Sequence, residues 1–150
     1  MKALKEAVHA ALRDDSTATV GLRDLLVQTV TPYGVYEANF PEQPNFKSKS
    51  YLTWQMIARV TTSSQLSDLR LREQTFAVTA YSTSPDTVDN ILRRAVFVLE
   101  NTKAVTLPTS DVVLDRILHE DSGPDLFNDK FSIYFRAENF RAFYREDITQ

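Results

Sequence analysis

The chain has 150 residues, enough for one domain whose core needs no covalent staple. It contains no cysteine, which excludes disulfides, thiolate metal sites and a cysteine nucleophile, and favours synthesis in a reducing cytoplasm. A net charge of −3 and a pI near 5.4 argue against a dominant phosphate-binding surface, so no specific nucleic-acid partner is expected. The N-terminal residues mix charged and apolar side chains, so we expect neither a signal peptide nor a membrane span.

The first third of the chain predicts one helix, one strand and a long loop. In residues 2–13 the apolar side chains recur at helical spacing with charges opposite, which predicts an amphipathic helix. Residues 17–31 combine helical leucine spacing with valines and threonines, so they predict a short turn of helix that continues into a strand. Residues 33–39 predict a first strand, and residues 40–50, with two prolines and no period, predict a loop.

Two strands follow, and we expect them to pair antiparallel. Residues 73–81 alternate between core and solvent, and residues 63–71 are polar enough for a long hairpin loop before them. Residues 51–62 also alternate, with Ile57 as the exception, and the side chains expected on the core side are Leu52, Trp54, Met56, Ala58 and Val60.

The clearest periodic signal lies in residues 84–101, which predict an amphipathic helix. Ser84 is placed to cap its first turn, Pro85 needs no amide partner there, and Asp86 favours the positive end of the helix dipole. Such a helix needs an apolar surface beneath it, and the strands on either side supply one. Its apolar stripe consists of Val88, Ile91, Leu92, Ala95, Val96 and Leu99.

The last third of the chain predicts two more strands and an apolar extension. Residues 112–119 and 130–137 form the strand pair, joined by an acidic loop at 121–129. Residues 138–150 begin with aromatic side chains on both faces, so we expect a C-terminal extension held against another surface. We therefore predict a single α+β domain, residues 1–150, whose mixed, mostly antiparallel sheet of about five strands carries two main helices on one face.

No group of residues has the spacing of a catalytic or metal site. His9 and His119 each lack a second imidazole at ligand spacing, which favours a surface position for His9 and either a rim position or a hydrogen-bonded position for His119. The loop 121–129 is the best candidate for a hard cation, but it lacks the ordered ligands of an EF-hand, which favours a solvated hairpin loop. The serines lack the flanking glycines of a nucleophile elbow, the turn that exposes a catalytic serine. We predict no enzymatic activity, no metal and no cofactor.

Aromatic and basic side chains in the loops and in the C-terminal segment are the candidates for an interface. A monomer would expose several of these aromatics, and interfaces favour them beside arginine. The alternative is that the aromatics clamp loops over the core, and ordinary solvated charge is favoured for the basic residues. Phe127 belongs to the same group of aromatics, and the candidate interface residues are Phe40, Phe46, Lys47, Lys49, Arg70, Arg72, Phe140, Phe143 and Tyr144.

The order of elements and several short strings resemble the tail terminator, or tail completion, proteins of long-tailed bacteriophages. The likeness lies in the helix at 4–12, the string Pro-Tyr-Gly-Val-Tyr at 32–36, the strand at 73–81 and the Ser-Pro-Asp helix start at 84–86. The proline-rich loop 40–50 replaces the polar stretch that usually follows the first strand in that family.

The resemblance implies a non-enzymatic virion protein that is made in the host bacterial cytoplasm and forms a ring, usually a hexamer, on the finished tail tube. Its expected partners are other copies of itself, the tail tube protein and the head–tail connector protein. We expect the loops 40–50 and 63–71 to lie at one end of the sheet and to reach the tube or a neighbouring subunit. Two alternatives are another connector or head-closure component, and an unrelated small α+β domain that binds a cation through the loop 121–129.

Overall fold

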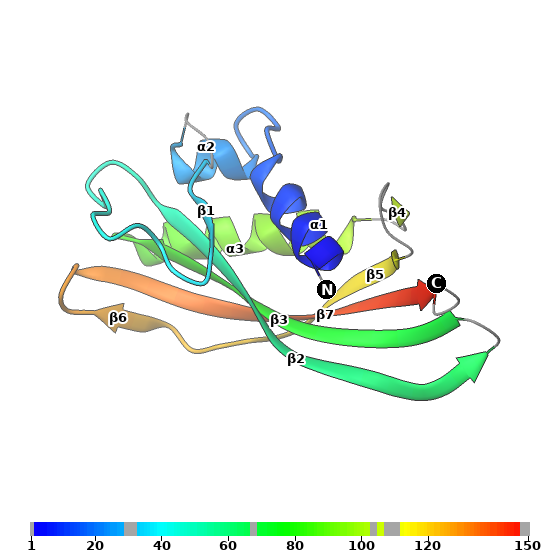
Figure 1. Cartoon of the computed structure of the whole chain (residues 1–150). Coiled ribbons are helices and arrows are strands. Elements are labelled where there is room, and N and C mark those ends of the chain that lie inside the picture. The colour runs from blue at the N-terminus through cyan, green and yellow to red at the C-terminus, as the bar shows by residue number, and fades with distance from the viewer. Residues whose placement is uncertain (1, 29–32, 67–68, 103–104, 107–111, 148–150) are drawn as a thin grey trace.

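Three helices cover one face of a long, twisted sheet in the computed structural model (Figure 1). The structure describes residues 2–28, 33–66, 69–102, 105–106 and 112–147. The predicted α+β class is confirmed. In chain order the elements are α1 Lys2–Arg13, α2 Leu22–Leu26, β1 Val35–Glu37, β2 Tyr51–Leu66, β3 Leu69–Ser82, α3 Pro85–Glu100, β4 Val105–Thr106, β5 Val112–Ser122, β6 Leu126–Asn128 and β7 Ile133–Asp147.

The sheet follows the order β1-β2-β3-β7-β5-β4, and β6 pairs with β7 beside this path. Strand β1 runs parallel to β2, while every other recorded pair is antiparallel. Because β3 and β5 are both antiparallel to β7, they run parallel to each other, and α3 is the crossover between them. The predicted mixed, mostly antiparallel sheet is therefore confirmed, with more strands than expected.

The main core lies between the helices and the sheet. The predicted stripe of α3 faces the strands, and only Val96 of its members stays partly exposed. On the strands, Phe76 and Phe140 stack with their ring centroids 5.3 Å apart beneath the helices. The fully buried large side chains of this core are Leu4, Leu12, Leu22, Leu26, Leu52, Phe76, Ile91, Leu92, Leu99, Leu114, Phe140 and Tyr144.

Helix α3 begins and ends close to the predicted positions, but the capping contacts differ. Ser84 is the N-cap residue, yet its hydroxyl makes no capping hydrogen bond. Pro85 begins the helix, as expected from its missing amide proton. At the other end, the Asn101 side chain donates to the Phe97 carbonyl over 2.7 Å, so a local side chain satisfies a carbonyl of the last turn.

Most of the polar segment 63–71 is strand rather than the long loop expected, because β2 continues to Leu66 and β3 starts at Leu69; residues 67–68 lie outside the described part of the chain. Threonine favours strands, and pairing with β3 satisfies the backbone whatever the polarity of the side chains. Since the loop 40–50 precedes β2 and the hairpin turn follows it, the two segments lie at opposite ends of this strand. Sixteen residues in extended conformation span up to about 50 Å. The expectation that both segments share one end of the sheet was wrong.

A β-bulge at Ile57 explains why this residue broke the predicted alternation. The register runs from Met56 opposite Phe76 to Ala58 opposite Thr75, which leaves Ile57 as the extra residue, 61% exposed. Beyond the bulge, Ala58 no longer stands opposite a core residue of β3. The predicted core side is confirmed for Leu52, Trp54 and Met56, while the side chains of Ala58 and Val60 lie outside those that the structure describes.

Two other segments differ from their predicted roles. Residues 138–147, expected as a C-terminal extension, form the second half of β7 between β3 and β5. Helix α2 ends at Leu26, and its C-cap residue Val27 adopts a left-handed conformation instead of starting a strand; residues 29–31 lie outside the described part of the chain. The sheet therefore gains a long central strand from the end of the chain.

Candidate functional site

The loop 38–50 is held against the sheet by a cluster of aromatic rings. Tyr51 and Tyr81 stand opposite each other and alternate with core residues, so they face away from the helices, onto what we call the open face. Phe40 lies 4.9 Å from Tyr81 and 5.4 Å from Phe46 between ring centroids, and 5.6 Å from Phe131. We call Phe40, Phe46, Tyr51, Tyr81, Phe131 and Ile133 the aromatic cluster. For Phe40 and Phe46 the structure thus favours loop clamping.

The four basic candidates do not form one site. Lys47 and Lys49 are exposed on the loop that the aromatic cluster anchors. Arg72 is buried within β3, and the Arg70 backbone pairs with Gln65 near the hairpin turn, at the other end of the sheet. Of these four candidates, the two lysines offer accessible charge at the loop end.

The three aromatic candidates from the C-terminal segment belong mainly to the core. Phe140 and Tyr144 are 0% and 2% exposed and face the helices. Phe143 alternates with them on the open face, where the Arg116 guanidinium lies 5.0 Å from its ring centroid. Phe143 alone of these three is partly accessible to a partner.

Two exposed apolar surfaces lie outside the nine candidate interface residues, and one of them contains Phe127, which was grouped with the surface aromatics from the sequence. One lies on β6 and β7, where Phe127 and Tyr134 form the hairpin patch, while Leu126, the neighbouring residue of β6, is exposed on the opposite face of the sheet. The other is a pocket of about 330 Å³ on the helical layer, which we call the helix pocket, with Val20 and Phe97 at its rim. Phe97 falls outside the apolar stripe of α3, and that departure from the period was the available signal.

A polar cavity of about 330 Å³ lies beneath α3 and contains His119, Ser122 and the buried carboxylate of Glu138. His119 Nε2 lies 2.7 Å from Glu138 Oε2, and the Ser122 hydroxyl donates to the same oxygen. Arg136 Nε donates to the other oxygen over 3.2 Å. Because the serine contacts the carboxylate and not the imidazole, this geometry provides no nucleophile–base pair. Its hydrogen bond to Glu138 gives His119 a structural partner, in line with the hydrogen-bonded position that was one of the two expected for it.

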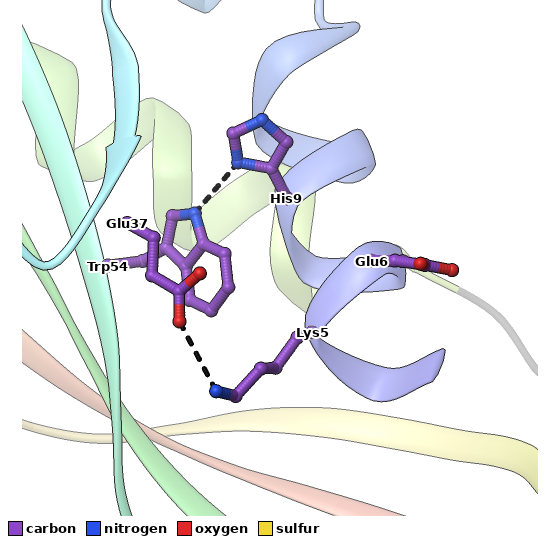
Figure 2. A pocket seen from close by; sticks show the side chains of 5 residues that line it. All are labelled: Lys5, Glu6, His9, Glu37 and Trp54. Carbon is purple, nitrogen blue, oxygen red and sulfur yellow. Dashed lines mark hydrogen bonds and ion pairs between the residues drawn. The ribbon is translucent and has the colours of Figure 1, made fainter. Parts of the chain in front are cut away.

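A second cavity, of about 300 Å³, opens between α1 and the β1–β2 edge (Figure 2). Trp54 Nε1 donates to His9 Nδ1 over 2.9 Å, which leaves the other ring nitrogen of a neutral His9 to carry the proton. Lys5 Nζ donates to Glu37 Oε1 over 3.3 Å, while Glu6 points away from the other four residues (Figure 2). These contacts tie α1 to the sheet, so His9 has a structural role.

Neutral His9 gives a testable pH dependence. Burial lowers the pKa of His9 and the nearby Arg13 lowers it further, although Glu37 and Asp14 act in the opposite direction. The unfolded chain therefore takes up its proton first, near pH 6.5, and stability is lost as pH falls from there to the lowered pKa of the folded state. Melting curves should show this loss in the wild type and not in His9→Gln, which keeps an acceptor for Trp54. Parallel curves for both proteins would contradict it.

Within the described ranges, no three or more His, Asp or Glu side chains are grouped to hold a metal ion. Part of the acidic loop 121–129 is strand β6, which pairs with β7. No helix in the described part of the chain is long and apolar enough to cross a membrane.

The chain was compared with family models, with curated proteins and with solved structures, and the solved structures gave matches. No family model matches the chain, and no curated protein matches it. Among solved structures, the chain is similar to a chain from the virion of a native gene transfer agent particle, with a TM-score of 0.67. The alignment covers 96% of both chains at 16% sequence identity. At this identity the match shows a shared fold, and it extends over nearly the whole of both chains.

Proposed function

We propose that this protein is a structural component of a phage-like virion, and that it forms a ring on the end of the tail tube, stops tube growth and offers the surface for head joining. The observation that carries the proposal is the fold shared with a virion chain over 96% of both chains. The tail-terminator resemblance of the sequence supports the finer role. The described cavities supply structural contacts and no catalytic geometry, which fits a protein that acts by assembly.

The shape of the sheet suits a protein that joins two partners. A ring between tube and connector needs contact surfaces that face in opposite directions. Strands β2 and β7, of 16 and 15 residues, separate the loop 38–50 from the β2–β3 hairpin turn. We infer that one end of the sheet meets the tube and the other meets the connector.

The mass of the purified protein in solution tests ring formation. Light scattering coupled to size exclusion should give a multiple of the 17.1 kDa protomer, alone or after addition of the tube protein. Six copies are expected from the family resemblance. A protein that stays monomeric under both conditions, at concentrations well above those in an infected cell, would overturn the proposal.

Another connector or head-closure role draws on the same fold observation. Cryo-electron microscopy of particles would separate the two, because a terminator lies directly on the last ring of tube protein. Density for this chain inside the head portal would favour the alternative.

The lysines of the loop 38–50 give a sharper test than removal of the loop, since Phe46 belongs to the aromatic cluster. Exchanging Lys47 and Lys49 for Glu should leave the melting temperature unchanged, because both side chains are exposed. It should weaken binding to the tube or to a neighbouring subunit, by about tenfold or more if both charges contact an acidic surface. Sedimentation with tube protein measures this, and exchanging both lysines for Arg is the matched control. Equal binding by all three proteins would contradict a role for these lysines.

A further inference from the structure

The helix pocket is apolar inside and has two arginines at its rim. Arg94 pairs with Asp15, and Arg93, whose side chain is 78% exposed, pairs with Asp89 over 2.9 Å. Val20, Leu25 and Phe97 line it together with the side chains of Arg93 and Arg94. Among its described lining residues none is acidic. Its volume of about 330 Å³ leaves room for an aromatic ring, since an apolar cavity of about 150 Å³ holds benzene.

The pocket is preorganised by contacts behind it. Arg94 binds both oxygens of Asp15, at 2.8 and 2.9 Å, which fixes its guanidinium. That guanidinium lies 4.8 Å from the centroid of the Phe97 ring, so the ring has one face covered while 54% of the residue is exposed. Val20 is 50% exposed beside it. A rigid, half-covered aromatic beside an apolar hollow is the kind of anchor site that protein interfaces use.

The hairpin patch has complementary chemistry. Phe127 is 50% exposed and packs on Tyr134 with ring centroids 5.0 Å apart. Asp125 and Asp129 flank β6 and are both exposed; Asp125 accepts a hydrogen bond from Arg136 Nη1 over 3.3 Å while its side chain stays 69% exposed. An aromatic side chain between acidic neighbours thus projects from one end of the sheet.

We propose that the hairpin patch of one copy docks in the helix pocket of the next copy, with Phe127 in the hollow and the flanking aspartates facing Arg93. This inference rests on the proposed ring, and it names the two surfaces that close it. The aromatic ring meets an apolar hollow, and the aspartates meet Arg93, whose exposed pair with Asp89 is of the weak kind that a partner carboxylate can share. Both surfaces are present on every copy. They lie in different parts of the molecule, the helix pocket on α2 and α3 in the helical layer and the hairpin patch on β6 and β7 in the sheet (Figure 1). Two different patches that meet form a heterologous contact, the type that generates rings.

Two variants that each remove one side of the contact test the proposal. Phe97→Glu places an acid in the pocket, and Phe127→Glu removes the aromatic anchor; both side chains are half exposed, so folding should persist. Each variant alone should weaken assembly about tenfold or more and sediment as a monomer. Mixed together, they should form a two-copy complex and no ring, because one intact pocket then meets one intact hairpin. Ile57→Glu, an exposed apolar residue outside both surfaces, should assemble as the wild type does.

The outcomes separate this contact from the wider proposal. Rings of normal mass from both variants would overturn the contact while leaving the ring itself in place. A wild type that never assembles would overturn the proposed function instead. Should either variant unfold by circular dichroism, Arg93→Asp and Asp125→Arg replace the pair: each single change should weaken assembly, and both in one chain should restore it. No restoration by the double change would count against the contact.

Discussion

Phe140→Ala should lower the free energy of unfolding by about 3–5 kcal/mol, the range found when a large aromatic leaves a packed core. Phe140 is fully buried, stacks on Phe76 at 5.3 Å between centroids, and lies in β7 at the centre of the sheet. Its removal leaves a cavity that two neighbouring strands and the helices above cannot fill without moving. Urea unfolding followed by circular dichroism measures the change.

The control for this prediction is Phe127→Ala, which alters an exposed ring of the hairpin patch. Its effect on unfolding should stay within about 0.5 kcal/mol, while its effect on assembly should be large. The opposite pattern, with Phe140→Ala stable and unassembled, would return Phe140 to the interface role that the sequence suggested.

Asp15→Ala should lower the free energy of unfolding by about 1–3 kcal/mol, because it leaves the partly buried Arg94 guanidinium and the Leu22 amide without their acceptor. The Asp15 side chain is 7% exposed and accepts two hydrogen bonds from Arg94 and one from the Leu22 amide, 2.9 Å away. It thereby joins the start of α2 to α3. Chemical denaturation measures the loss.

The neighbouring carboxylate supplies a matched control. Asp14 forms an exposed pair with Arg13, so Asp14→Ala should cost about 0–1 kcal/mol. Equal costs at both positions would contradict the structural role of Asp15.

Acid should remove the contribution of Asp15. Burial acts to raise the pKa of Asp15, but the hydrogen bonds from Arg94 and the Leu22 amide outweigh it, so the pKa is lowered. A carboxyl with a lowered pKa stabilises the fold above its unfolded value, near pH 3.9, and the gain is lost as pH falls through the folded value. The stability difference between wild type and Asp15→Asn should therefore shrink below about pH 4. A difference that stays constant in acid would argue that packing, and not charge, accounts for it.

Local periodicity predicted much of the fold. The stripe of α3 and the alternation of residues 73–81 reflect one apolar face on a helix and on a strand, so both were readable from spacing alone. The crossover rule then gave the relative direction of β3 and β5. A hydrogen-bonded, structural His119 was among the expectations because the sequence offers no second histidine or cysteine at the spacing of a metal site.

Contacts between distant residues were not readable in this way. Arg94 and Asp15 are 79 positions apart, and no local pattern couples them. The length of β2 depends on pairing with β3 rather than on the polarity of its own residues. The aromatic side chains of Phe140 and Tyr144 are equally typical of a core strand and of an apolar extension that binds a partner. Only the position of β7 between β3 and β5 shows that they belong to a core strand. For that reason the predicted interface residues spread over the core and both ends of the sheet.

The length of tail tubes assembled with and without this protein tests the central claim most directly. Purified tube protein polymerised in its presence should give short tubes with a ring at one end in electron micrographs, and adding more of the protein should shorten them further. Without it, the same tube protein should keep growing. Tubes of equal length with bare ends in both reactions would contradict a terminating role.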